Sequence, residues 1–148
     1  MSAESGCGCG GIGTETVILA CSGAADVGEV ADQSARLLTR ERAGNMACLA
    51  GIGARIEGMV KDAKEAATLL VIDGCQTSCG KKAVEGAGIT KFLHLQLRDI
   101  GYKKGSTPPK EETIKIVAAR ARVILEEPRR DQSGCCEAGQ DCGCSKSS

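Results

Sequence analysis

The stretch TLLVIDGCQTSCG, residues 68–80, places a short apolar run directly before a segment that holds two cysteines. The run TLLVID (68–73) predicts a β-strand, because it is continuous, short and rich in aliphatic residues. A helix is expected next, from about residue 76 to 85, and Gly-Ala-Gly would end it. Cys75 and Cys79 are four residues apart, so such a helix would place them on one face. The two thiols could bind a metal, carry out redox chemistry or pack in the core.

Strand-length apolar runs and segments of helical periodicity alternate along the rest of the chain. The further strands are expected at 16–20, 45–50 and 91–97, and the further helices at 25–40, near 54–66 and at 109–126. This order predicts an α/β fold of three layers, with a mainly parallel sheet of about four strands and helices on both faces, Rossmann-like or flavodoxin-like. The carboxyl ends of parallel strands share one edge, where open α/β sheets bind ligands.

Composition and the chain ends limit the function classes. The 148 residues include 19 basic and 19 acidic side chains, so the formal net charge is zero and no nucleic-acid or acidic-membrane partner is expected. No apolar run is long enough to span a membrane, and residues 1–14 lack a secretory signal pattern. A cytoplasmic location is therefore expected. The domain is predicted at 15–128, between a flexible Gly/Cys-rich tail (1–14) and a flexible Cys-rich tail (129–148).

Ten cysteines in a cytoplasmic protein indicate metal ligands or reactive thiols more than a disulfide framework. Four of them lie in the predicted domain, at or near the ends of predicted strands: Cys21, Cys48, Cys75 and Cys79. Paired strands are ~4.8 Å apart, so thiols at neighbouring strand ends can converge. Four thiolates suit tetrahedral Zn²⁺, and an iron–sulfur cluster accepts the same set. The positive end of a helix starting near Gln76 would offset their negative charge.

Other interpretations of the same residues remain open. Cys48 could be a small core residue inside an apolar strand. Cys75 could be the nucleophile of a thiol oxidoreductase or thiol transferase, with Cys79 as the resolving thiol. Asp73 could orient a metal ligand from outside the coordination shell, although a helix cap through its carboxylate is favoured. His94, in the middle of a strand, is interpreted as structural, and no constellation typical of a hydrolase is present.

The cysteines of the two tails allow two interpretations. Flexible thiolates could capture additional Zn²⁺ or Cu⁺, or the tails could simply be disordered ends. These possible extra metal ligands are Cys7, Cys9, Cys135, Cys136, Cys142 and Cys144.

Four segments, in this order, resemble the DGC-domain family of zinc-binding proteins. They are CSGAADVGEVADQSARLL (21–38), MACLAGIGARI (46–56), VIDGCQTSCGKKAVEGAGI (71–89) and LRDIGYKKG (97–105). The family is named for an Asp-Gly-Cys motif, here Asp73-Gly74-Cys75, and the likeness covers about residues 15–125. It implies zinc held by the four cysteines of the domain and gives no role to the tails. The sequence therefore predicts a zinc-binding protein that acts in metal sensing, storage or delivery, and a metal ion is the one partner it indicates.

Overall fold

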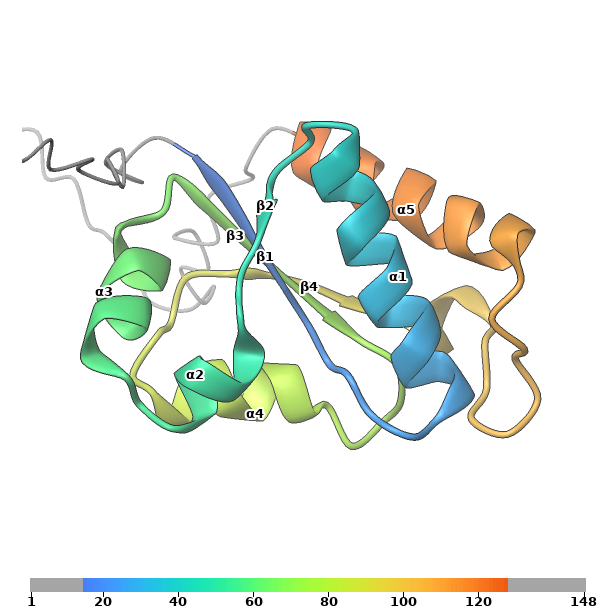
Figure 1. Ribbon diagram of the computed structural model, residues 1–148, viewed down its shortest axis with the longest axis horizontal. Helices are drawn as coiled ribbons and strands as arrows, with labels where there is room; N and C mark the ends of the chain where they lie inside the picture. The colour runs from blue at the N-terminus through green and yellow to red at the C-terminus, as the bar shows by residue number, and fades with distance from the viewer. Residues whose placement is uncertain (1–14, 128–148) are drawn as a thin grey trace, which may run out of the picture.

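The computed structural model describes residues 15–127, which form an α/β fold of three layers (Figure 1). The strands of this part of the chain are β1 (Thr16–Ala20), β2 (Asn45–Met46), β3 (Thr68–Asp73) and β4 (Leu93–Gln96). They pair in parallel, in the order β2-β1-β3-β4. This is the strand order of flavodoxin-like folds, and it confirms the predicted parallel sheet.

Helices cover both faces of the sheet, as predicted. In Figure 1, α1 (Asp26–Arg40) and α5 (Glu111–Glu126) lie on one side of the strands. On the other side lie α2 (Leu49–Gly53), α3 (Glu57–Glu65) and α4 (Cys79–Gly86). A 3₁₀ turn, η1 (Leu97–Ile100), follows β4.

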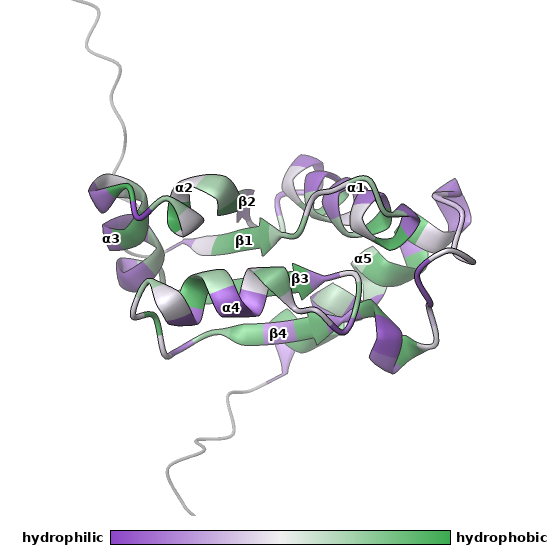
Figure 2. Ribbon diagram, turned by 90° about the horizontal axis from the view of Figure 1, so that it is seen from below, coloured by the Kyte–Doolittle hydropathy of each residue, from purple (hydrophilic) through white to green (hydrophobic). Residues whose placement is uncertain are grey.

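Two apolar clusters, one on each face of the sheet, make up the core. In β1, the side chains of Ile18 and Ala20 pack in the cluster that includes α1 and α5, whereas Val17 and Leu19 pack in the cluster that includes α2, α3 and α4. The side chains of β3 alternate in the same way. Figure 2 shows mostly hydrophobic residues along the strands and many hydrophilic residues on the outer turns of the helices. Both central strands are buried on both faces, which explains their continuous apolar runs.

The second predicted strand is much shorter than expected. It was predicted at 45–50, but β2 ends at Met46, and α2 begins at Leu49. β2 is an edge strand that pairs with β1 alone, so sheet pairing does not hold its remaining residues. The amides of Gly51 and Ile52 instead bond to the carbonyl of Cys48 and start a helix. The helix predicted near 54–66 is α3, and Arg55, in a left-handed conformation, separates it from α2.

The helix after β3 also starts later than predicted. It was expected from residue 76, but α4 begins at Cys79. Residues 75–78 form a turn closed by a 3.0 Å bond from the Ser78 amide to the Cys75 carbonyl. Ser78 is left-handed, with φ of 50°, which interrupts helical geometry. Cys75 and Cys79 therefore do not lie on successive turns of one helix.

None of the helices between residues 15 and 127 is long and apolar enough to cross a membrane. The two predicted tails, with their six cysteines, fall outside the described residues.

Candidate functional site

Two of the predicted metal-binding cysteines meet where the strand order reverses. The chain leaves β1 toward β2 and leaves β3 toward β4, so the loops that follow β1 and β3 face each other at the carboxyl edge. Ligands of open α/β sheets bind at this position. The Cys21 amide donates to the Ile72 carbonyl at 2.9 Å, and the Gly74 amide donates to the Cys21 sulfur at 3.2 Å. The loops that carry Cys21 and Cys75 are thereby joined.

Gly74, the middle residue of the Asp-Gly-Cys motif, lies against the first turn of α1. A Cβ atom at this position would be 2.6 Å from the carbonyl oxygen of Val27 and 3.0 Å from the amide of Gly28. Both are backbone atoms of a helix and cannot give way locally. The glycine therefore allows the loop after β3, which carries Cys75, to approach α1 closely.

Asp73 caps α4, as favoured from the sequence. Its carboxylate is fully buried and accepts hydrogen bonds from the amides of Gly80 at 2.7 Å and Lys81 at 2.9 Å. His94 Nε2 lies 2.9 Å from Asp73 Oδ2. Burial acts to raise the pKa of Asp73, but the hydrogen bonds from His94, Lys81 and Gly80 outweigh it and lower the pKa. Asp73 is thus a buried carboxylate that fixes the start of α4.

The contact between His94 and Asp73 was not predicted. His94 pairs with Val71 in the parallel register, so Asp73 lies two residues further along β3. Side chains two residues apart on a strand share a face. The contact depends on the register of β3 and β4, which the sequence does not give. In the structure, Asp73 is the partner of His94.

Side chains at and just after the end of β4 hydrogen-bond to residues 75–78, the turn that carries Cys75. Gln96 Nε2 donates to the Cys75 carbonyl at 2.9 Å and to the Ser78 hydroxyl at 2.8 Å. The Arg98 guanidinium donates to the Gln76 side-chain oxygen. Neither residue stood out in the sequence, because each acts only through a segment about twenty residues away.

Cys75 and Cys21 differ in acidity. The side-chain and backbone hydrogen bonds from Thr77 lower the pKa of Cys75, assisted by the positive charge of Lys104, and they outweigh burial and the charge of Asp73. Burial instead raises the pKa of Cys21 to about 11, despite the bond from the Gly74 amide. Negative charge on Asp73 and on the other thiols of the edge adds to that rise. Cys75 is therefore the more acidic of the two thiols, and Cys21 favours its protonated form.

The segment that carries Lys104 is tied to the first turn of α1. The Asp26 carboxylate accepts hydrogen bonds from the amides of Gly105 at 2.8 Å and Thr107 at 2.7 Å. The Thr107 hydroxyl donates to the Lys103 carbonyl at 2.9 Å, which closes a compact loop. Residues 103–107 are called the α1 strap below. The strap brings a cationic side chain to the cysteine edge.

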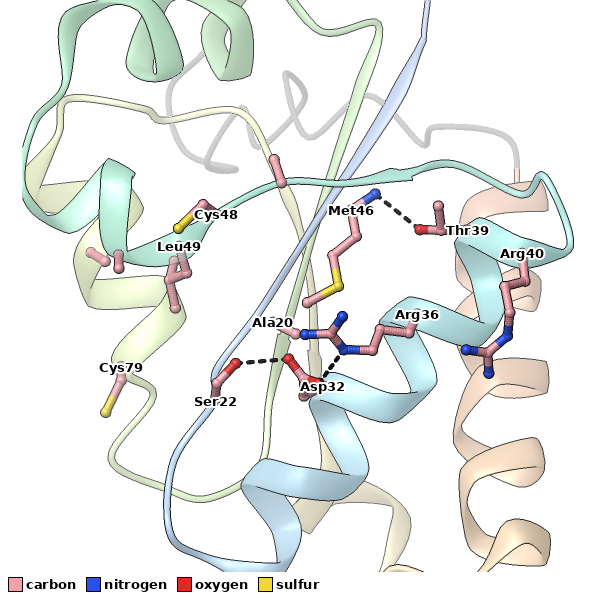
Figure 3. A pocket seen from close by; sticks show the side chains of 13 residues that line it. Ala20, Ser22, Asp32, Arg36, Thr39, Arg40, Met46, Cys48, Leu49 and Cys79 are labelled. Atoms are coloured by element: carbon pink, nitrogen blue, oxygen red, sulfur yellow. Dashed lines mark hydrogen bonds and ion pairs between the residues drawn. The ribbon is translucent and has the colours of Figure 1, made fainter.

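Cys48 and Cys79 lie at the same edge but are not gathered with the other two cysteines. Both are exposed, so the interpretation of Cys48 as a core residue is wrong. They line a pocket between α1, the segment after β2 and α4, and Figure 3 shows the Cys79 sulfur directed away from Cys48. Within residues 15–127, all four cysteines are free thiols, and no three His, Cys, Asp or Glu side chains are grouped closely enough to hold a metal ion. The four-cysteine zinc site and the iron–sulfur alternative stay predictions.

Comparison with known proteins agrees with the resemblance seen in the sequence. The family model described as the DGC domain matches residues 17–121. A protein named anaerobic and virulence modulator AnvM, from Pseudomonas aeruginosa strain PAO1, is 34% identical over 88 residues, which cover 60% of this chain and 67% of that protein. No solved structure matches significantly. The chain belongs to the DGC-domain family.

Proposed function

We propose that this domain binds zinc through cysteine thiolates at the carboxyl edge of its sheet, as a metal-sensing, storage or delivery protein. The observation that carries the proposal is the bond from the Gly74 amide to the Cys21 sulfur, which joins the loops after β1 and β3 at the ligand edge. Cys48 comes two residues after β2, and Cys79 is the first residue of α4. Zn²⁺ readily binds four cysteine thiolates in tetrahedral geometry.

The donor set fits zinc in its chemistry. The lowered pKa of Cys75 favours the thiolate form, which is the form that ligates zinc. Cys21 is a thiol in the metal-free domain, and the charge of a bound cation would favour its thiolate. When bound, the metal would be held by Cys75 and Cys21, with Cys48 and Cys79 as the remaining ligands.

The exposure of two of the four thiols supports an exchangeable metal over a structural one. A structural zinc site is normally closed and buried, and the fold depends on it. Here Cys48 and Cys79 are exposed, so a metal ion held by them would be open to exchange with solvent and with other ligands. The relative is named as an anaerobic and virulence modulator, and a regulatory role of this domain would agree with a site that loads and releases metal.

A thiol-dependent oxidoreductase is the second candidate, favoured by the hydrogen bonds that Thr77 makes to Cys75. The Cys75 thiolate would attack a disulfide, form a mixed disulfide and expel one thiolate, which takes up a proton. Cys79 would then attack the Cys75 sulfur, forming an internal disulfide and releasing the second half of the substrate as a thiol. This step requires Cys79, whose sulfur lies on the exposed side of α4, to turn toward Cys75.

Metal content distinguishes the candidates. The full chain is purified anaerobically without chelators, with the six tail cysteines replaced by serine so that they cannot contribute, and its metals are measured by mass spectrometry. About one zinc per chain, lost in Cys75→Ser and in Cys21→Ser, supports the zinc proposal. Equal zinc in these variants and their parent contradicts it.

Two further readouts cover the alternatives. No metal, together with alkylation of Cys75 before the other cysteines and a reversible Cys75–Cys79 disulfide, favours the oxidoreductase. Visible absorbance with bound iron favours an iron–sulfur cluster on the same cysteines. A colourless protein that contains zinc excludes the cluster.

A further inference from the structure

A pocket of about 780 Å³ opens beside the cysteine edge, between α1, the segment after β2 and the start of α4 (Figure 3). Neither Cys21 nor Cys75 lines it, so it is distinct from the meeting point of the loops after β1 and β3. Its walls combine apolar side chains with three hydrogen-bonded polar residues from α1 and from the loop before it. We refer to it as the α1–α2 pocket.

The polar chain in the α1–α2 pocket starts at Ser22. The Ser22 hydroxyl donates to Asp32 Oδ1 at 2.9 Å, and Arg36 Nε donates to Asp32 Oδ2 at 2.6 Å. Burial acts to raise the pKa of Asp32, but the bonds from Arg36 and Ser22 lower it, so the carboxylate is charged. Both of its oxygens already have partners. Asp32 therefore positions Arg36 and offers little to a ligand.

Arg36 keeps its terminal nitrogens for a ligand. Only its Nε is engaged with another residue in the part of the chain that the structure describes, and 56% of the side chain is exposed. Figure 3 shows the guanidinium directed toward Ala20 and Met46, into the pocket. A guanidinium whose Nε is fixed presents its outer nitrogens as a ready donor pair for a carboxylate.

The charges of the pocket favour an anion. Asp32, Arg36 and Arg40 are the charged residues of its lining, which gives one excess positive charge. Met46 and Leu49 supply apolar surface to the same pocket. The pocket thus suits a small carboxylate with a short apolar body.

Two exposed free thiols, Cys48 and Cys79, line the same pocket as Arg36. Of the two, Cys48 lies between Met46 and Leu49 in the chain, so it belongs to the apolar wall. We propose that the α1–α2 pocket binds small carboxylate-bearing thiols and their disulfides, and that Arg36 directs the disulfide form to Cys48. A ligand of this class uses the guanidinium, the apolar wall and the thiol together.

In this thiol–disulfide exchange, the bound disulfide is itself the oxidant of Cys48. The Cys48 thiolate attacks one sulfur of the bound disulfide, forming a bond from Cys48 to that half. The original sulfur–sulfur bond breaks, and the other half leaves as a thiolate and takes up a proton. Cys48 is oxidised and the leaving half is reduced, so no other oxidant is needed. A free thiol reverses the reaction.

The test compares three disulfides on the reduced, metal-free full chain: anionic glutathione disulfide, neutral bis(2-hydroxyethyl) disulfide and cationic cystamine. The rate of adduct formation at Cys48 is followed by acid quenching and peptide mass mapping. Each rate is divided by that of a free peptide covering residues 45–51, which removes the intrinsic reactivity of the reagent. Because metal is absent, the result does not depend on the zinc proposal.

Two matched variants assign the effect to the pocket. Arg36→Gln removes the charge that the proposal invokes. Arg120→Gln removes an equal charge from the exposed surface of α5, outside the pocket lining. Arg40→Gln, at the rim, tests the second positive charge, and circular dichroism verifies the fold of each variant.

We expect Cys48 to react preferentially with glutathione disulfide. Arg36→Gln should lower the ratio of the glutathione disulfide rate to the cystamine rate by about fivefold, the scale of one partly screened surface charge. Arg40→Gln should lower it less, and Arg120→Gln should leave it unchanged. The proposal is overturned if Cys48 does not react, or if its relative rates with the three disulfides equal those of the free peptide. A preference that survives Arg36→Gln, or falls equally in Arg120→Gln, also overturns it.

Discussion

The carboxylate of Asp26 accepts a 2.7 Å hydrogen bond from the backbone amide of Thr107, 81 residues later in the chain. A second bond from the Gly105 amide completes the attachment of the α1 strap to α1. These bonds also lower the pKa of Asp26. The strap carries Lys104, whose charge favours the thiolate of Cys75. One residue of α1 thus links the α1 strap, which follows β4, to the acidity of a cysteine in the loop after β3.

The first prediction concerns this attachment. Asp26→Asn should release the strap, reduce the influence of Lys104 and raise the pKa of Cys75, because an amide accepts these backbone bonds less strongly than a carboxylate. The pH dependence of Cys75 alkylation, read by peptide mass mapping, measures the shift. Glu29→Gln is the control, because Glu29 is an exposed acid in the same first turn of α1. An unchanged profile in Asp26→Asn would show that the strap does not act on Cys75.

The second prediction concerns the hydroxyl of Thr77. Thr77→Val removes its side-chain hydrogen bond to Cys75, so the thiolate loses stabilisation and the pKa of Cys75 rises. Alkylation of Cys75 at pH 7 should slow by about threefold, the scale of one modest hydrogen bond. Thr90→Val is the matched control at an exposed position. Equal rates in the two variants would argue against this role of the hydroxyl.

The third prediction tests Gly74. Gly74→Ala places a methyl group against the backbone of α1 and should lower the free energy of unfolding by about 2–3 kcal/mol. Gly58→Ala is the control, because its added Cβ meets nothing within 4 Å in the first turn of α3. That variant should be neutral or up to ~1 kcal/mol more stable. Urea unfolding of both variants measures the difference, and a neutral Gly74→Ala would mean that α1 yields to the loop.

The fourth prediction is the pH dependence of the Asp73 cap. The pKa of Asp73 is lowered in the folded state from its ordinary 3.8, so its charged form stabilises the fold. This contribution is complete above the unfolded-state pKa and is lost as the pH falls through the folded-state pKa. Asp73→Asn should therefore destabilise the domain at pH 7, by about 2 kcal/mol for a buried charged acceptor. The loss should shrink below about pH 4.

His94→Gln provides the comparison for that prediction. It removes the contact with Asp73 Oδ2 and leaves the two amide bonds of α4 in place. Its effect at pH 7 should be smaller than that of Asp73→Asn in urea unfolding. If the two variants lose equal stability, the cap of α4 contributes nothing beyond the histidine contact.

The parts of the fold that could be predicted are those set by local pattern. β1 and β3 are buried on both faces, so their apolar runs were sufficient to locate them. The long helices α1 and α5 carry clear periodicity and were predicted within two residues at each end. β2 was predicted too long because an edge strand ends where its pairing ends, and the sequence does not contain that information.

The meeting of the loops that carry Cys21 and Cys75 at the carboxyl edge was predicted, but the side-chain contacts around these loops were not. The rule that parallel strands end at one edge was enough to bring Cys21 and Cys75 together. The start of α4 depends on a buried carboxylate from β3 and on the side chain of Gln96 from β4. Both are tertiary contacts, and this is why the helix was expected at residue 76 and the two cysteines were expected on one of its faces.

The pKa of Cys75 is lowered and that of Cys21 is raised by the fold, so the relative reactivity of the two thiols reports whether the domain is folded. The bond from the Gly74 amide, the bonds from Thr77 and the burial of Cys21 all disappear when the chain unfolds. Both thiols then return toward the same ordinary reactivity. The ratio of their alkylation rates should therefore be far from one in the native domain and should collapse toward one in denaturant, so that two residues report the integrity of the whole sheet without any added probe.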